Sequence, residues 1–297
     1  MSLRIVELFG YSSVDSSSPA QSHRSDLRCP FLRDRCTKTL SDGTVSGVCT
    51  VKQVNSGPVV CCPVRLYAAD YKILLDIATD CFGLDVRLVA GSANLSEVSD
   101  GKAVAVFGKR WGRELHLPQR GGVGSYFVDW VLAHLAPDGT LKEFVAVEVQ
   151  TIDTTGNYRD ERQAHMDGTG FVGNSTAGIN WENVSKRILP QLIYKGHVLR
   201  REKLCSKGLF FVCPTPIYER IVRRLGGELL DYMPQPGALT FRHYDLGPDL
   251  GQGEIRDLLF KGQRTTTVDQ VANALSSPTN LPAAGVYQHA IEIAIGN

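Results

Sequence analysis

Two carboxylates near the middle of this 297-residue chain have the types and spacing to do chemistry. Asp129 lies in the apolar run SYFVDWVLAHL, and Glu148 lies in FVAVEVQT, whose alternating valines are typical of a β-strand. An Asp138-Gly139 pair between them favours a two-residue hairpin turn, which would place Asp129 directly opposite Glu148. Like charges opposed in this way are destabilising unless a cation lies between them. A divalent cation such as Mg²⁺ would resolve this because it prefers oxygen ligands, whereas a solvent-exposed aspartate is the alternative.

The strand that carries Glu148 is expected to have two different faces, because successive side chains of a strand point to opposite sides. One face is formed by Val145, Val147 and Val149. The other face carries Phe144, Ala146, Glu148 and Gln150. This second face changes from apolar to polar along its length, as expected for a strand whose end opens into a cleft. A half-exposed strand end is the alternative.

A second set of candidate ligands lies near the N-terminus, where five of the eight cysteines fall within the first 62 residues. The surrounding segment, about 20–65, is rich in turn residues, so a metal held by four thiolates would supply folding energy that burial cannot. The expected ligands are Cys29, Cys36, Cys49 and Cys62, with Cys61 as the alternative to Cys62. The spacing lacks paired C-x-x-C motifs. Sulfur ligation suits iron and zinc alike, and unligated thiols are the remaining alternative.

The formal net charge is only +1, but basic residues gather in one segment. Between Val184 and Lys207 there are seven Lys or Arg against a single acidic residue, Glu202. Such a cluster is expected for contacts with DNA phosphates, although a solvated helix face is a common alternative. Two further arginines follow the predicted carboxylate site. The candidate DNA-binding residues are Arg159, Arg162, Lys186, Arg187, Arg200 and Arg201.

The elements that must position these residues predict an α/β fold with a mixed sheet. We expect a helix that ends at Gly83, the strands RLVAG and AVAVFG, the carboxylate hairpin, a helix that ends at Gly196, the strand GLFFVCP, the helix PIYERIVRRLGG and the strand LTFRHYDL. The expected division is an N-terminal segment at 1–70, with the cysteine module at about 20–65, and a core at 71–297. No stretch approaches the roughly 20 apolar residues of a membrane span, and the start lacks the features of a signal peptide. We therefore expect a cytoplasmic protein without membrane association.

Taken in this order, the motifs resemble those of the NotI-type restriction endonucleases and, in size, their shorter EagI-like members. The resemblance rests on the cysteine module that begins Cys29-Pro-Phe, followed by FVDWVLA, AVEVQTIDTTGNYR and NWENVSKRILPQLIYKG. It extends from the cysteine module to the C-terminal helix and strand region.

The resemblance implies a PD-(D/E)xK nuclease core with an inserted cysteine-rich metal-binding module near the N-terminus. Asp129 and Glu148 take the positions of its metal ligands, and Glu114 matches an upstream acidic residue of the site. Gln150 takes the position of the usual lysine. A neutral glutamine supplies no charge and cannot act as a base, so water activation would fall to the metal. The resemblance also implies iron, with zinc as the alternative, in the four-cysteine site.

The function implied is that of a homodimeric type II restriction endonuclease. Such an enzyme would use Mg²⁺ to cut both strands of double-stranded DNA at a palindromic G/C-rich site with a GGCC core. Opposed carboxylates and a cation beside an arginine-bearing loop also suit phosphodiester hydrolysis without reference to the family. The alternatives are a non-catalytic metal-ribbon DNA-binding protein and a structure-specific DNA or RNA nuclease.

Overall fold

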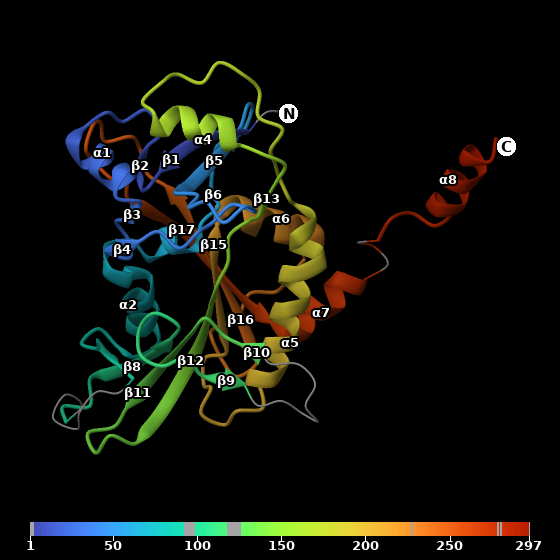
Figure 1. Cartoon of the computed structure of the whole chain (residues 1–297). Helices are drawn as coiled ribbons and strands as arrows, with labels where there is room; N and C mark the ends of the chain where they lie inside the picture. Colours follow the sequence, from blue (N-terminus) through green and yellow to red (C-terminus); the bar gives the residue numbers. More distant parts are fainter. Residues whose placement is uncertain are drawn as a thin grey trace.

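The computed structural model describes residues 3–91, 99–117, 126–226, 228–277, 279 and 281–296, and Figure 1 shows how its elements are arranged. In chain order the elements are β1 (Leu3–Leu8), β2 (Tyr11–Ser12), α1 (Ser18–Ser25), β3 (Arg28–Cys29), β4 (Asp34–Arg35), β5 (Val48–Gln53), β6 (Pro58–Val60), η1 (Pro63–Tyr67), α2 (Ala68–Phe82), β7 (Arg87–Ala90), β8 (Ala103–Gly108), β9 (His116–Leu117), β10 (Tyr126–Phe127), β11 (Trp130–Leu135), β12 (Leu141–Val149), β13 (Thr154–Thr155), α4 (Arg159–Met166), β14 (Gly178–Ile179), η2 (Val184–Ile188), α5 (Leu189–Leu199), β15 (Leu209–Pro214), α6 (Thr215–Leu225), β16 (Ala238–Leu246), β17 (Leu258–Thr267), α7 (Val268–Ser276) and α8 (Val286–Ala294).

A mixed seven-stranded sheet forms the centre of the described chain, in the order β17-β16-β15-β12-β11-β8-β7. The pairs β12–β15, β15–β16 and β7–β8 are parallel, and the other neighbours are antiparallel. The α/β class and the mixed sheet predicted from the sequence are therefore confirmed. Strand β12, which carries Glu148, lies in the middle of this sheet, so its second half is covered on both sides.

Helices cover the two faces of this sheet differently. Helix α2 lies on one face, where its Ile73, Leu74 and Ile77 share a hydrophobic cluster with the β12 valines. Helices α5, α6 and α7 lie on the other face, where Ala146 belongs to a second cluster (Figure 1). The predicted separation of the valine face from the Ala146 face is therefore confirmed. In α6 the buried residues Ile217, Ile221 and Leu225 recur at helical spacing, and the helix ends at Gly226 in the left-handed conformation.

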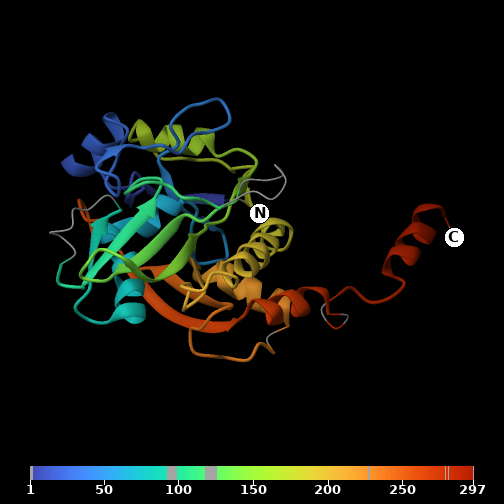
Figure 2. The ribbon, with the colours of Figure 1, turned by 90° about the horizontal axis from the view of Figure 1, so that it is seen from below.

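The N-terminal part of the chain forms a smaller sheet, in the order β2-β1-β5-β6, and α1 and the later helix α4 lie beside it (Figure 1). Leu3, Ile5 and Leu8 of β1 belong to the same buried cluster as Ala146 and the helices on that face of the central sheet. The cysteine-bearing segment and the central sheet thus pack around a common core. Figure 2, which is turned by 90° from Figure 1, shows the same proximity.

The hairpin between β11 and β12 has a longer loop than predicted, but its strands pair in the predicted register. The turn is not a two-residue loop. The N–H of Ala136 donates to the carbonyl of Thr140, the N–H of Gly139 donates to the carbonyl of Ala136, and Gly139 at φ 81° ends a three-residue loop. A register shift between His134 and Leu135 then restores the expected pairing, so that Trp130 lies opposite Val147. A three-residue hairpin loop commonly ends in a left-handed glycine that forms such a bulge. The additional loop residue shifts the register by one position, and the bulge shifts it back, so the predicted pairing is kept although the predicted loop length was wrong.

The helix before β15 also differs from its prediction. It begins with a π-helical turn, η2, and continues as α5 beyond Gly196 to Leu199. A Cβ atom built on Gly196 would lie 2.3 Å from Cγ2 of Val268 in α7. Gly196 is therefore a site of close helix packing and not a helix stop.

The C-terminal helix α8 extends away from the rest of the chain in Figures 1 and 2, and none of its residues is buried. Of the helices that the structure describes, none is long and apolar enough to cross a bilayer.

Candidate active site and cysteine cluster

The two candidate carboxylates meet where β11 begins and β12 ends. Asp129 immediately precedes β11, and its Oδ2 accepts a hydrogen bond of 2.9 Å from the backbone N–H of Val149. Trp130 pairs with Val147, so the next residues in this register are Asp129 and Glu148. The side chain of Glu148 is buried, with a relative exposure of 3%. The hairpin therefore brings the two carboxylates together, as the sequence predicted.

Glu148 is held by two nitrogen donors that converge on one of its oxygens. Its Oε1 accepts from Lys195 Nζ of α5 at 2.6 Å and from Gln150 Nε2 at 3.0 Å. The amide of Gln150 also donates to Gln191 Oε1 of α5 at 3.1 Å. Lys195 is itself buried, with 8% exposure. Neither Lys195 nor Gln191 was predicted to lie in the site.

The sequence did contain a signal for Lys195. The buried residues of η2 and α5 include Ile188, Leu192, Lys195 and Leu199. A lysine at the spacing of an apolar stripe is costly to bury unless its ammonium is paired, so its position points to a specific partner.

The other oxygen of Glu148 has a different environment. Oε2 is buried and has no hydrogen-bond partner among the described residues. Burial raises the pKa of Asp129 to about 7, and the nearby charges of Glu148 and Glu114 act in the same direction. Glu114 is half-buried in the loop before β9, so the acidic residue expected upstream is near the pair. A buried oxygen without a partner beside two further carboxylates suits a hard cation such as Mg²⁺.

Four of the five N-terminal cysteines line one small cavity, of about 10 Å³: Cys29, Cys36, Cys49 and Cys62. Burial raises the pKa of Cys29 to about 11, and it raises the pKa of Cys36 and Cys49 as well. These thiols therefore keep their protons near neutral pH unless a cation binds them.

Cys61 lies in different surroundings from Cys62. Its Sγ lies 3.4 Å from Nζ of Lys38, and it packs in the cluster of the N-terminal sheet. The side chain of Cys61 is not among those that line the cavity of the four thiols. Of the two alternatives for the fourth ligand, Cys62 is the one that faces the other three cysteines.

Neither set of ligands is already arranged around an ion. In the part of the chain that the structure describes, no three His, Cys, Asp or Glu side chains are placed so that they could hold a metal together. The four cysteines thus line one cavity, and the metal-binding module stays a prediction.

The six candidate DNA-binding residues occupy three different places. Arg162 is buried and its Nε donates to the carbonyl of Ser46 at 2.8 Å, so the expectation that it contacts DNA is corrected. Arg159, Lys186 and Arg187 are exposed on the side where the chain leaves β12; Arg187 Nη1 lies 3.2 Å from Asp153 Oδ2, just beyond Gln150.

Arg200 and Arg201 lie at the other end of α5. Arg200 Nη1 lies 2.5 Å from Asp269 Oδ2 of α7, and Arg201 is exposed. At about 1.5 Å per helical residue, Arg200 is about 20 Å from Arg187 along the helix. The basic segment is therefore not a single patch.

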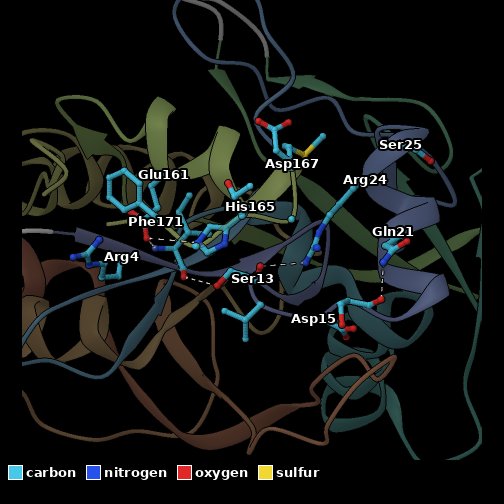
Figure 3. A pocket seen from close by; sticks show the side chains of 17 residues that line it. Arg4, Ser13, Asp15, Gln21, Arg24, Ser25, Glu161, His165, Asp167 and Phe171 are labelled. Atoms are coloured by element: carbon cyan, nitrogen blue, oxygen red, sulfur yellow. Dashed lines mark hydrogen bonds and ion pairs between the residues drawn. The ribbon is translucent and has the colours of Figure 1, made fainter. Parts of the chain in front are cut away.

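A cavity of about 780 Å³ lies between β1, α1 and α4, away from the carboxylates (Figure 3). Its buried charged side chains each have at least one protein partner, although Arg24 Nε and Glu161 Oε2 have none among the described residues. Glu161 Oε1 accepts from the N–H of Ile5 at 2.9 Å, and Arg24 Nη2 donates to the carbonyls of Ser12 and Ser13. None of the predicted site residues lines this cavity.

Comparison with known proteins gives one family. The model of a family described as restriction endonuclease NotI matches residues 9–218. The match includes the cysteine cluster, both strands of the carboxylate hairpin, α5 and β15. No curated protein matches the chain.

Proposed function

The chain belongs to the NotI restriction endonuclease family, and from this premise we propose that it is a type II enzyme that cuts both strands of DNA at a specific site with Mg²⁺. The observation that carries the proposal is the close Asp129–Glu148 pair, in which Glu148 is buried, Asp129 is half-buried, and Oε2 of Glu148 has no partner among the described residues. Lys195 pairs with Glu148 through Oε1. With both carboxylates ionised, the group still carries one negative charge in excess, which a divalent cation bound by both carboxylates would offset.

Each residue of the site would have a distinct role in phosphodiester hydrolysis. Asp129 and Glu148 would hold the Mg²⁺, with Glu114 as the nearby third carboxylate. The bound ion supplies water activation and charge stabilisation at the scissile phosphate. Gln150 bridges Glu148 and Gln191 with its amide, and this neutral group orients the carboxylate without acting as a base.

The four thiols around the small cavity would hold one structural iron, with zinc as the alternative. The convergence of four thiols on one small cavity supports this, because a bound metal ion would contribute folding energy to the segment.

The DNA target proposed is a palindromic G/C-rich site with a GGCC core. Guanine offers O6 and N7 in the major groove, and arginine or lysine reads this pair of acceptors through two hydrogen bonds. A palindrome meets the same protein surface twice, so the active species is proposed to be a two-fold homodimer. Arg159, Lys186 and Arg187 are the exposed candidates for these contacts, and Arg187 pairs with Asp153 in the chain that follows β12.

The test replaces each carboxylate by alanine. We expect Asp129→Ala and Glu148→Ala to bind DNA in Ca²⁺ but to cleave at least about 10³-fold more slowly in Mg²⁺, because a metal-site loss of about 4 kcal/mol corresponds to that factor. Asp138→Ala is the control, since this carboxylate lies at the far end of the same hairpin and bonds to Thr140.

The assay uses DNA of known sequence, and the ends of the products are sequenced. Discrete fragments with identical ends support a site-specific enzyme. Binding without cleavage by the wild-type protein would favour the non-catalytic DNA-binding alternative, and random or structure-dependent products would favour the other nucleases. Near wild-type cleavage by either alanine variant would contradict the assignment of the metal site.

A further inference from the structure

A buried lysine from another part of the chain enters the carboxylate site, although the position of the motif lysine is occupied by Gln150. Lys195 belongs to α5, and its ammonium lies 2.6 Å from Glu148 Oε1. The two residues are 47 positions apart in the sequence. An ion pair of this kind costs desolvation on both sides, so its presence inside the protein calls for a functional reason.

The geometry of the shared oxygen points to that reason. Lys195 Nζ and Gln150 Nε2 both donate to Glu148 Oε1, at 2.6 Å and 3.0 Å. The ammonium of α5 therefore contacts the same carboxylate oxygen as the side chain at position 150. Gln191, one helical turn before Lys195, holds the Gln150 amide. These contacts occupy Oε1 and leave Oε2 of Glu148 buried and without a partner.

The backbone of the helix contributes to this orientation. The turn Val184–Ile188 before α5 is π-helical, and the N–H of Leu189 donates to the carbonyl of Val184. One residue more in a turn rotates the following helix by about 100° relative to a regular α-helix. The π turn thus sets which face of α5, with Gln191 and Lys195, points toward β12. Such turns are frequent at functional sites.

We propose that Lys195 is the positioning lysine of this active site: its ammonium replaces the charge missing at Gln150, fixes Glu148 through Oε1 and directs Oε2 toward the cation. This inference rests on the proposed function. It also separates Lys195 from the other basic residues of its segment, because a buried lysine that contacts a carboxylate is not a phosphate contact.

The experiment transfers the ammonium group from position 195 to position 150, on the other side of Glu148 Oε1. Lys195→Gln removes it, and the double variant Lys195→Gln with Gln150→Lys restores it from the other side. Lys72→Gln, an exposed lysine of α2 that pairs with Asp76, is the matched control. Single-turnover cleavage in Mg²⁺, DNA affinity in EDTA and the melting temperature in EDTA are measured for each protein.

We expect Lys195→Gln to slow cleavage about 10- to 100-fold, as is typical when the partner of a metal ligand is lost, with DNA affinity unchanged within about twofold. The double variant should regain at least about tenfold in rate, and the Lys72→Gln control should match the wild type. Cleavage by Lys195→Gln at the wild-type rate overturns the proposal, as does a fall in its DNA affinity that accounts for the whole loss.

The double variant decides the matter even if Lys195→Gln does not fold. A folded and active double variant supports the proposal, whereas an unfolded one, or one no faster than the single variant, overturns it. A wild-type protein that cuts no DNA would contradict the proposed function itself.

In that case the melting temperatures still test the ion pair. Lys195→Gln should have a lower melting temperature than the wild type in EDTA, and the double variant should regain the melting temperature of the wild type. Equal melting of the single and double variants would overturn it.

Discussion

Cys61 and Cys62 are adjacent in the chain but differ in what their sulfur atoms face, and this difference gives a prediction at the scale of single residues. Cys62 lines the cavity of the four thiols, and Cys61 lies beside Lys38. We expect the wild type to carry about one iron or zinc per chain, Cys62→Ser to lose it and Cys61→Ser to keep it, because a four-thiolate site holds one ion. Elemental analysis of the purified proteins measures this. Equal metal contents in the two variants would contradict the assignment of Cys62.

The residues of the carboxylate site differ in how far the sequence could reveal them. Asp129 and Glu148 were predictable because a short hairpin links them, although their register depends on a bulge at His134–Leu135 that offsets the unpredicted third loop residue. Lys195 was not assigned because its contact with Glu148 joins distant segments, and a pattern along one helix does not name its partner. Arg162 was misassigned because a positive charge near a predicted site says nothing about burial.

At the scale of elements, the central strands β8, β12, β15 and β16 were predicted from their apolar runs, which are long enough to be distinctive. Strand β17 was not, because its sequence LLFKGQRTTT is mostly polar, with only Thr265 and Thr266 buried, and pairing with β16 makes it a strand. The hairpin turn was predicted with the wrong length, since Asp-Gly suits both a two-residue loop and the last two positions of a three-residue loop. Pairing with neighbouring strands thus determines the strand state of β17 and the length of the hairpin loop, which the local sequence does not specify.

The close approach of β15 to β16 gives a prediction that concerns these elements. Gly208 precedes β15 at φ 76°, and a Cβ there would lie 2.2 Å from the carbonyl oxygen of Ala238. Gly168 has a similar φ of 67° but no atom within 4 Å of its Cβ position. We expect Gly168→Ala to lower the free energy of unfolding by about 1–2 kcal/mol through backbone strain alone.

Gly208→Ala should lower the free energy of unfolding by a further 1–3 kcal/mol or so, because the backbone oxygen cannot give way without disturbing the parallel pairing. Denaturant unfolding of both variants at one temperature measures the difference. Equal losses would mean that the two strands adjust without cost, and the packing argument for Gly208 would then be wrong.

At the scale of the whole molecule, the cysteine cluster, the central sheet and α5 converge on one end of β12. The chain that leaves β12 carries Asp153 and Arg159, and these residues share a cavity of about 530 Å³ with Lys38 and Ser41 of the cysteine-bearing segment. The segment between β4 and β5 therefore contacts the chain that follows β12, through the Arg159–Asp42 ion pair and the Ser46–Tyr158 hydrogen bond. A metal bound by the four cysteines, as proposed, would stabilise this contact without touching the carboxylates.

The DNA surface is predicted to lie on this side of the molecule, and Arg187 and Arg200 test it as a matched pair. Each is an exposed arginine of the same helical segment in an exposed ion pair, with Asp153 and with Asp269 respectively. Such pairs are worth at most about 1 kcal/mol, so a phosphate or a base can replace the carboxylate. We expect Arg187→Ala to weaken binding and Arg200→Ala to leave it within about twofold, because only Arg187 lies beside the loop that follows Gln150.

The measurement is DNA affinity in Ca²⁺ at two salt concentrations, on the preferred site and on single-mismatch duplexes. If Arg187 contacts a phosphate, its loss should weaken binding to all the duplexes and reduce the salt slope by about 1. If it reads a guanine, the loss should instead remove about 1–3 kcal/mol of discrimination at one base pair. Each effect should occur once per half-site, so sedimentation of the complex should find two chains per duplex. A larger effect of Arg200→Ala than of Arg187→Ala would place the DNA at the opposite end of α5, and one chain per duplex would contradict the two-fold arrangement.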